Sequence, residues 1–144
     1  MMPHRVGIPE DEPWLDKHSE WIDGQAIEKP NGALASWVNC RLLGRLHQHV
    51  CAHELGTVFS STCGYQAFAD QPSKVRRVGG SFIACSRLAN DEAPEGNVRI
   101  APDLACELIG PDDGATALER RVADFLAAGT QLFWIVYLNF RTVF

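Results

Sequence analysis

The sequence APDLACELIGPDDGATALERRVADFLAAGTQLFWIVY, residues 101–137, decides the fold because it contains a complete strand–helix–strand pattern. Apolar runs predict strands over 104–109 and 132–138, and the helical spacing of apolar residues between them predicts an amphipathic helix over 115–128. Gly129 is the expected end of that helix. Because crossovers between parallel strands are right-handed, we expect the two strands to be central neighbours with the helix packed across them.

One carboxylate, Glu107, lies inside the first of these strands. Its neighbours on both sides are apolar, which is typical of a strand covered on both faces. A carboxylate in such a strand loses its hydration and needs a cation, a metal ion or a hydrogen-bond network in compensation. Glu107 is therefore the first candidate for metal-dependent chemistry.

The rest of the chain adds elements around this core. Residues 1–19 predict a loose arm, and Asp23-Gly24 between two apolar runs predicts a hairpin over 21–27. The other expected elements are a helix over 33–55 ended by Gly56 and strands over 57–61, 65–68, 75–84 and from 141 onward. The inward-facing residues expected on the two helices are Leu34, Val38, Leu42, Leu46 and Val50, then Leu118, Val122, Phe125 and Leu126.

Composition favours a single soluble globular domain. The chain has 144 residues, 46% of them hydrophobic and 22% charged. No apolar run approaches the ~18 residues of a membrane span, and the start lacks the apolar core of a signal peptide. The five cysteines are odd in number and form no CxxC pair, which argues against a disulfide framework or a zinc knuckle and favours reduced thiols in the cytoplasm.

The net charge of −5 excludes a typical basic nucleic-acid-binding domain. Lys74, Arg76 and Arg77 form the one dense basic patch, which we interpret as a solvated strand end, with phosphate contacts to DNA as the alternative. The histidines of the 33–55 helix lack a third ligand, so they predict a polar helix face instead of a metal site. The four tryptophans predict core and hairpin packing instead of base-stacking platforms.

The order of these pieces resembles the Uma family of restriction endonucleases, within the PD-(D/E)XK nuclease superfamily. The matching segments are residues 21–25, 42–46, 56–61, 76–77, 101–108, 119–121, 127–129 and 134–136. The resemblance covers residues 20–144 in the right order, which is more specific than any one motif. It implies one restriction-endonuclease-like domain, short at its C-terminus, with an α/β (α+β mixed) sheet flanked by helices, and Mg²⁺-dependent hydrolysis of DNA phosphodiesters.

The chain departs from this family at its catalytic positions. By the resemblance, Gly79 occupies the position of the first metal-binding Asp, Glu107 keeps the second acid, and Arg121 occupies the position of the Lys. Glycine supplies no ligand, and an arginine does not lose its proton in practice. We therefore expect weak or absent Mg²⁺ binding and a buried ion pair between Glu107 and Arg121.

The chain contains other acids that could substitute as metal ligands. Asp103 shares a strand face with Glu107, but at ~3.3 Å per residue their Cα atoms lie about 13 Å apart, too far for one ion. Asp103 is instead expected to organise the turn after Pro102. Asp112, Asp113 and Asp70 remain the substitute candidates, although the first two also suit a helix cap.

Two functions of different classes follow from the resemblance. The first is a metal-dependent DNA endonuclease that uses Glu107, with activity impaired by the missing Asp. The second is a non-catalytic nuclease-fold module that binds DNA or a protein. The expected partners are DNA and a second copy of the chain in a homodimer, with no membrane.

Overall fold

The computed structural model describes residues 19–28, 32–110 and 114–144. The predicted arm over 1–19 therefore lies almost wholly outside the described residues, as do the candidate ligands Asp112 and Asp113. The elements in order are β1 (Ser19–Ile22), β2 (Gln25–Glu28), α1 (Ala33–Ala52), β3 (Gly56–Phe59), β4 (Gly80–Ala84), a 3₁₀ turn η2 (Ala89–Asp91), β5 (Leu104–Ile109), α2 (Ala115–Ala128), β6 (Leu132–Tyr137) and β7 (Thr142–Val143).

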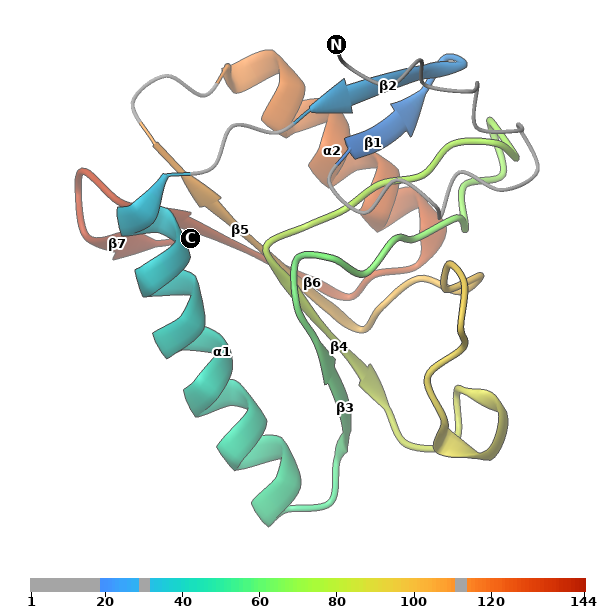
Figure 1. Ribbon diagram of the computed structural model, residues 1–144, viewed down its shortest axis with the longest axis vertical. Helices are drawn as coiled ribbons and strands as arrows, with labels where there is room; N and C mark the ends of the chain where they lie inside the picture. The colour runs from blue at the N-terminus through green and yellow to red at the C-terminus, as the bar shows by residue number, and fades with distance from the viewer. Residues whose placement is uncertain (1–18, 29–31, 111–113) are drawn as a thin grey trace, which may run out of the picture.

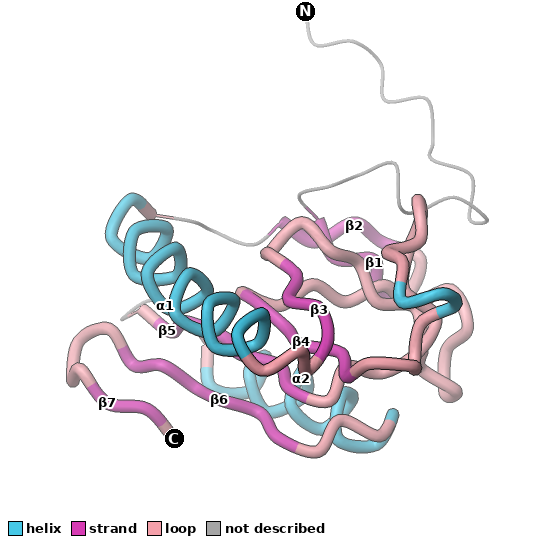
Figure 2. Tube along the Cα trace, turned by 90° about the horizontal axis from the view of Figure 1, so that it is seen from below, coloured by secondary structure: helices cyan, strands magenta, loops and turns pink. Residues whose placement is uncertain are grey.

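A mixed sheet in the order β3-β4-β5-β6-β7 forms the centre of the described chain (Figure 1). All neighbouring strands are antiparallel except β5 and β6, which are parallel, with Glu107 opposite Ile135. Helices α1 and α2 cover opposite faces of this sheet (Figure 2). The predicted mixed sheet with flanking helices is confirmed, and so are its two parallel strands with the helix across them. No helix in the described ranges is long and apolar enough to cross a bilayer.

Helix α2 ends where the sequence predicts. Gly129 adopts a φ of +114°, a left-handed conformation that glycine reaches at little cost, and its N–H and that of Thr130 bond to carbonyls of the last turn. Leu118 and Phe125 are buried as expected, whereas Leu126 is 49% exposed, contrary to the prediction. The buried face of α2 is thus narrower than the apolar face that its sequence predicts.

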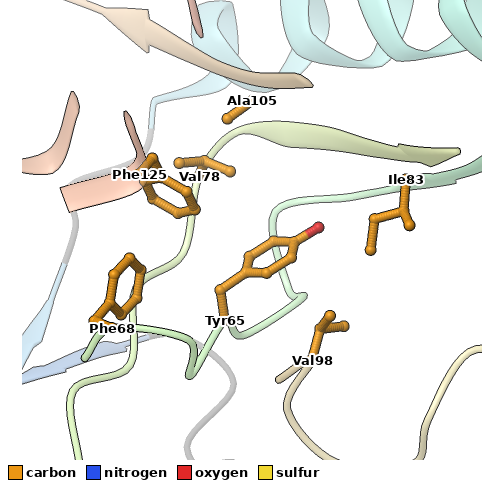
Figure 3. Packing of buried hydrophobic residues seen from close by; sticks show 7 residues of the cluster. All are labelled: Tyr65, Phe68, Val78, Ile83, Val98, Ala105 and Phe125. Carbon is orange, nitrogen blue, oxygen red and sulfur yellow. The ribbon is translucent and has the colours of Figure 1, made fainter. Parts of the chain in front are cut away.

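The main core lies between α2 and the sheet. Phe125 of α2 packs edge-on against the rings of Tyr65 and Phe68 (Figure 3). It packs in the same way against the ring of Phe133. The buried cluster consists of Tyr65, Phe68, Val78, Ile83, Val98, Ala105 and Phe125. Full burial of one such aromatic side chain contributes about 1.5–3 kcal/mol, so this cluster fixes α2 against β5.

The predicted hairpin is confirmed as β1 and β2. Asp23 and Gly24 both have positive φ, +52° and +70°, as the tight turn between twisted strands requires. Two backbone hydrogen bonds, 2.8 and 2.7 Å long, join Trp21 to Val75. The hairpin is thereby held beside α2 and the segment before β4 (Figure 1).

The clearest differences from the predicted elements lie between residues 52 and 84. Residues 65–68 form no strand, because Tyr65 makes single bridges to both Arg76 and Val98 and sends its ring into the core. The strand predicted over 75–84 is reduced to β4, residues 80–84. Helix α1 ends at Ala52 instead of running to 55, and Gly56 belongs to β3, with a φ of +153° that lets its Cα approach β4 closely.

Exposure also corrects several inward-facing assignments. Leu34 is 57% exposed, because a four-residue row turns about 40° per step around a helix of 3.6 residues per turn. Four steps therefore place it about 160° from the buried Val50. Trp37, also on α1, is 59% exposed and does not pack in the core. Leu132, in a strand expected to be buried, is 50% exposed.

Candidate functional site

Glu107 of β5 is 5% exposed and faces α2. Its Oε2 lies 3.5 Å from Nη1 of Arg121, so the two oppositely charged groups expected to pair are in contact. Arg121 lies in the second turn of α2, where the crossover from β5 brings it back over the sheet. The parallel β5–β6 pair and the helix between them thus position both groups.

A second buried carboxylate, Glu20 of β1, holds the same arginine. Nη2 of Arg121 donates to Oε1 of Glu20 over 2.5 Å, and Nε donates to Oε2 over 3.3 Å. Glu20 is 1% exposed and also accepts the backbone N–H of Arg77 at 3.1 Å. Such two-pronged arginine–carboxylate contacts are the strong, geometrically defined kind. Arg121 therefore lies between Glu20 and Glu107.

A third carboxylate, Asp124, extends the cluster along α2. Its Oδ2 accepts from Nζ of Lys74 at 3.1 Å and from Nε of Arg76 at 2.8 Å. Arg76 also lies 3.7 Å from Glu20, and Lys74 also binds Asp70 at 2.7 Å. We call the set Glu20, Lys74, Arg76, Glu107, Arg121 and Asp124 the buried charge network.

The interpretation of Lys74, Arg76 and Arg77 as a solvated strand end is wrong. Their exposed fractions are 6%, 6% and 3%, because the hairpin and α2 pack over this segment. Lys74 and Arg76 point to carboxylates of the network and form no surface patch. Their predicted contact with DNA phosphates stays a prediction, and it would require the network to open.

Gly79 lies one residue before β4 and close to α1. Its carbonyl accepts a hydrogen bond from Nδ2 of Asn39 at 2.8 Å. A Cβ built at Gly79 would lie 3.2 Å from both the carbonyl oxygen of Cys106 and Cδ1 of Leu108, and 3.4 Å from Oδ1 of Asn39. A side chain here would be crowded by β5 and by α1, so the neighbours would have to shift by a few tenths of an ångström.

The candidate substitute ligands among the described residues are engaged in other contacts. No group of three or more His, Cys, Asp or Glu side chains in the described part of the chain is arranged to hold a metal ion. Asp70 is exposed at the outer end of the network and is bound to Lys74. Asp103 accepts from the N–H of Ala84 and from Arg87, both at 2.7 Å, so it fastens β5 to the end of β4 instead of organising the turn after Pro102.

A second polar cluster, formed by Cys63, Tyr65 and Ser81, has a structural role and is poorly suited to nucleophilic attack. The Tyr65 hydroxyl and Oγ of Ser81 form a buried hydrogen bond of 2.5 Å. Burial raises the pKa of the Cys63 thiol to about 11 and raises the pKa of Tyr65 further above its usual value. A thiol that stays protonated near neutral pH is a poor nucleophile.

Sequence reasoning missed Glu20 and Asp124 as members of the site. Glu20 immediately precedes Trp21 in the predicted hairpin, and Asp124 lies three residues after Arg121 on the predicted helix. The second spacing was a usable signal, because residues three apart are neighbours on a helix. Nothing in the local sequence around Glu20 indicates its distant partner.

Asp124→Asn is expected to lower the free energy of unfolding by roughly 2–4 kcal/mol, because two buried cations lose their shared carboxylate. Asp70→Asn is the matched control. It should change the stability by no more than about 0.5 kcal/mol, since Asp70 is exposed and screened by water. Urea denaturation at pH 7 measures both, and equal effects would contradict this account of the network.

The contribution of Asp70 to the stability of the fold should depend on pH, and the sign of this dependence can be predicted. The Lys74 ammonium holds the pKa of the Asp70 carboxyl below its usual range. The small stabilisation that the Asp70–Lys74 ion pair contributes is therefore fully present above the ordinary pKa of an aspartate. It is lost as the pH falls through the lowered pKa of Asp70.

Comparison with known proteins places these observations in a family. The model of the Uma2 family, described as "Putative restriction endonuclease", matches residues 9–144. A crystal structure titled as a putative nuclease belonging to DUF820, from Anabaena variabilis ATCC 29413, superposes with a TM-score of 0.72 at 24% identity. That alignment covers 89% of this chain and 70% of the other. No curated protein matches the chain.

Proposed function

Because this chain belongs to the Uma2 family of restriction-endonuclease-like proteins, we propose that it binds DNA through a nuclease fold whose metal-dependent cleavage is absent or severely reduced. The observation that carries the proposal is the position of Arg121, between Glu20 and Glu107. A permanent cation there satisfies the carboxylates that a metal ion would otherwise need.

The chemistry explains why this replacement matters. Mg²⁺ needs a near-octahedral set of oxygen ligands, usually with one or two carboxylates and several waters. Its role in phosphodiester hydrolysis is to activate water and to neutralise charge on the phosphoryl group. A guanidinium supplies charge but no coordinated water, and it cannot act as a base near neutral pH. Gly79 adds no ligand.

One observation favours the enzyme as a second candidate. Glu20 and Glu107 both contact the same guanidinium, so two acids converge on a single small region. If Arg121 swung outward, the pair could provide oxygen ligands to a divalent ion. The active-endonuclease candidate therefore requires a displaced Arg121.

The experiment combines plasmid nicking with metal and DNA titrations of the full chain. We expect no nicking with Mg²⁺ or Mn²⁺ and divalent-metal binding no tighter than millimolar by calorimetry. We also expect a fluorescein-labelled duplex to bind without added metal at low salt. Glu107→Gln, which keeps the shape of the side chain, should change none of these results apart from stability.

Two outcomes would overturn the proposal. Micromolar, stoichiometric metal binding together with nicking, both lost in Glu107→Gln, would establish the enzyme instead. Failure of the wild-type chain to bind the duplex at low salt would remove DNA binding from the proposal.

A further inference from the structure

Helix α1 has a charge distribution unlike the rest of the chain. The protein carries a net charge of −5, yet α1 contains no acidic residue. A row with four-residue spacing runs along the helix and just past its end, and all of its members are exposed. The members of this α1 basic row are Trp37, Arg41, Arg45, His49 and His53.

The row lies on the outside of the molecule. The other side of α1 contacts β3 and β5, with Val50 buried and Leu43 close to Gly80. Figures 1 and 2 show the helix lying along one face of the sheet, with no other described helix or strand on its outer side. The row is thus available without any rearrangement of the core.

Its cations are placed for an external anion. Among the described residues, no carboxylate forms an ion pair with Arg41 or Arg45. The Arg41 guanidinium lies 5.2 Å from the centre of the Trp37 ring, a cation–π contact that orders both side chains. By contrast, Lys74 and Arg76 are buried against carboxylates.

We propose that the α1 basic row is the surface on which this chain binds the phosphate backbone of DNA, an inference that rests on the DNA binding proposed above. A four-residue row turns about 40° around the helix at each step, so Arg41 and Arg45, one step apart, are the two cations that face nearly the same way. Duplex DNA carries about one negative charge per 1.7 Å of axis, so two neighbouring guanidinium groups can both reach phosphates of one duplex. The exposed Trp37 adds an aromatic face at one end of the row.

Charge and shape favour DNA over an anionic membrane. A helix that lies in a bilayer interface buries a broad apolar face among the lipids. The apolar face of α1 is already packed on the sheet, and between Trp37 and His53 its outer residues are small or polar. Leu34 and Trp37, both near the start of the helix, are its exposed large hydrophobic residues.

The test compares two double variants that remove the same charge. Arg41→Gln/Arg45→Gln alters the row, and Arg99→Gln/Arg120→Gln alters two exposed arginines outside α1. Fluorescence anisotropy with a labelled 20-base-pair duplex gives Kd between 50 and 200 mM salt, and circular dichroism confirms folding. We expect the row variant to raise Kd about tenfold at 50 mM salt and to reduce the salt slope by about two, roughly one per lost phosphate contact. The control should raise Kd less than twofold.

Each outcome is decisive. If wild type binds the duplex and the two double variants bind alike, the row is not the contact surface, although the proposed function stands. If wild type does not bind at 50 mM salt, the proposed function and this inference both fail. Vesicles with phosphatidylserine should not compete with DNA, and stronger binding to vesicles that depends on Arg41 and Arg45 would overturn the assignment to DNA.

Discussion

Arg121→Ala is expected to lower the free energy of unfolding by roughly 3–5 kcal/mol, the usual cost of leaving buried charge without its partner. Glu20 and Glu107, 1% and 5% exposed, both contact this guanidinium. Glu20 would keep the Arg77 N–H and a longer contact to Arg76, whereas Glu107 would lose its contact with Arg121. Chemical denaturation at pH 7 measures the loss.

Arg120→Ala provides the control, because the adjacent Arg120 is exposed. It should change the stability by no more than about 0.5 kcal/mol. Arg121→Lys should fall between the two variants, since an ammonium keeps the charge but cannot form two parallel bonds to Glu20. Equal stability of the Arg121→Ala and Arg120→Ala variants would show that the buried contacts do not stabilise the fold.

The strand–helix–strand unit could be predicted from sequence because its signals are local. The apolar spacing of α2 and the glycine at its end set its limits at Ala115 and Ala128 without reference to other segments. The signal for the Asp23-Gly24 turn is also local, because two adjacent residues with positive φ define the hairpin. Local signals of this kind can be interpreted without knowledge of the tertiary contacts.

The candidate site could be predicted only in part because most of it is non-local. The contact of Arg121 with Glu20 joins residues 101 positions apart, and that of Arg76 with Asp124 joins residues 48 apart. Consecutive basic residues are normally exposed, so the segment containing Lys74 appeared solvated. The burial of Lys74 and Arg76 becomes favourable because Asp124 of α2 accepts hydrogen bonds from both side chains.

The predictions of strands over 65–68 and 75–84 are wrong for a related reason. Tyr65 has the β-propensity of a strand residue, but it forms single bridges to two different segments instead of a ladder. Propensity describes a residue that suits a half-buried extended backbone. It does not state whether a continuous partner strand exists, and here none does within the described residues.

The double variant Gly79→Asp/Arg121→Lys is expected to gain Mn²⁺-dependent nicking of plasmid DNA, which we expect the wild type not to show. By the family resemblance, residues 79 and 121 take the positions of the first acid and the lysine, so the double variant supplies both groups, and Mn²⁺ suits carboxylate ligands. Gly79→Asp alone should gain less, because Arg121 would remain as a competing cation between Glu20 and Glu107. Adding Glu107→Gln to the double variant should abolish the gain.

Gly79→Asn/Arg121→Lys is the matched control, since asparagine fills the same space without the charge. Both double variants should lose similar stability, because any Cβ at residue 79 would lie 3.2 Å from the Cys106 carbonyl oxygen and from Leu108. A difference in nicking between them therefore reports metal binding and not packing. If the folded Asp variant binds Mn²⁺ no better than the Asn variant, the carboxylate at residue 79 does not reach Glu107, and the catalytic correspondence of Gly79 must be abandoned.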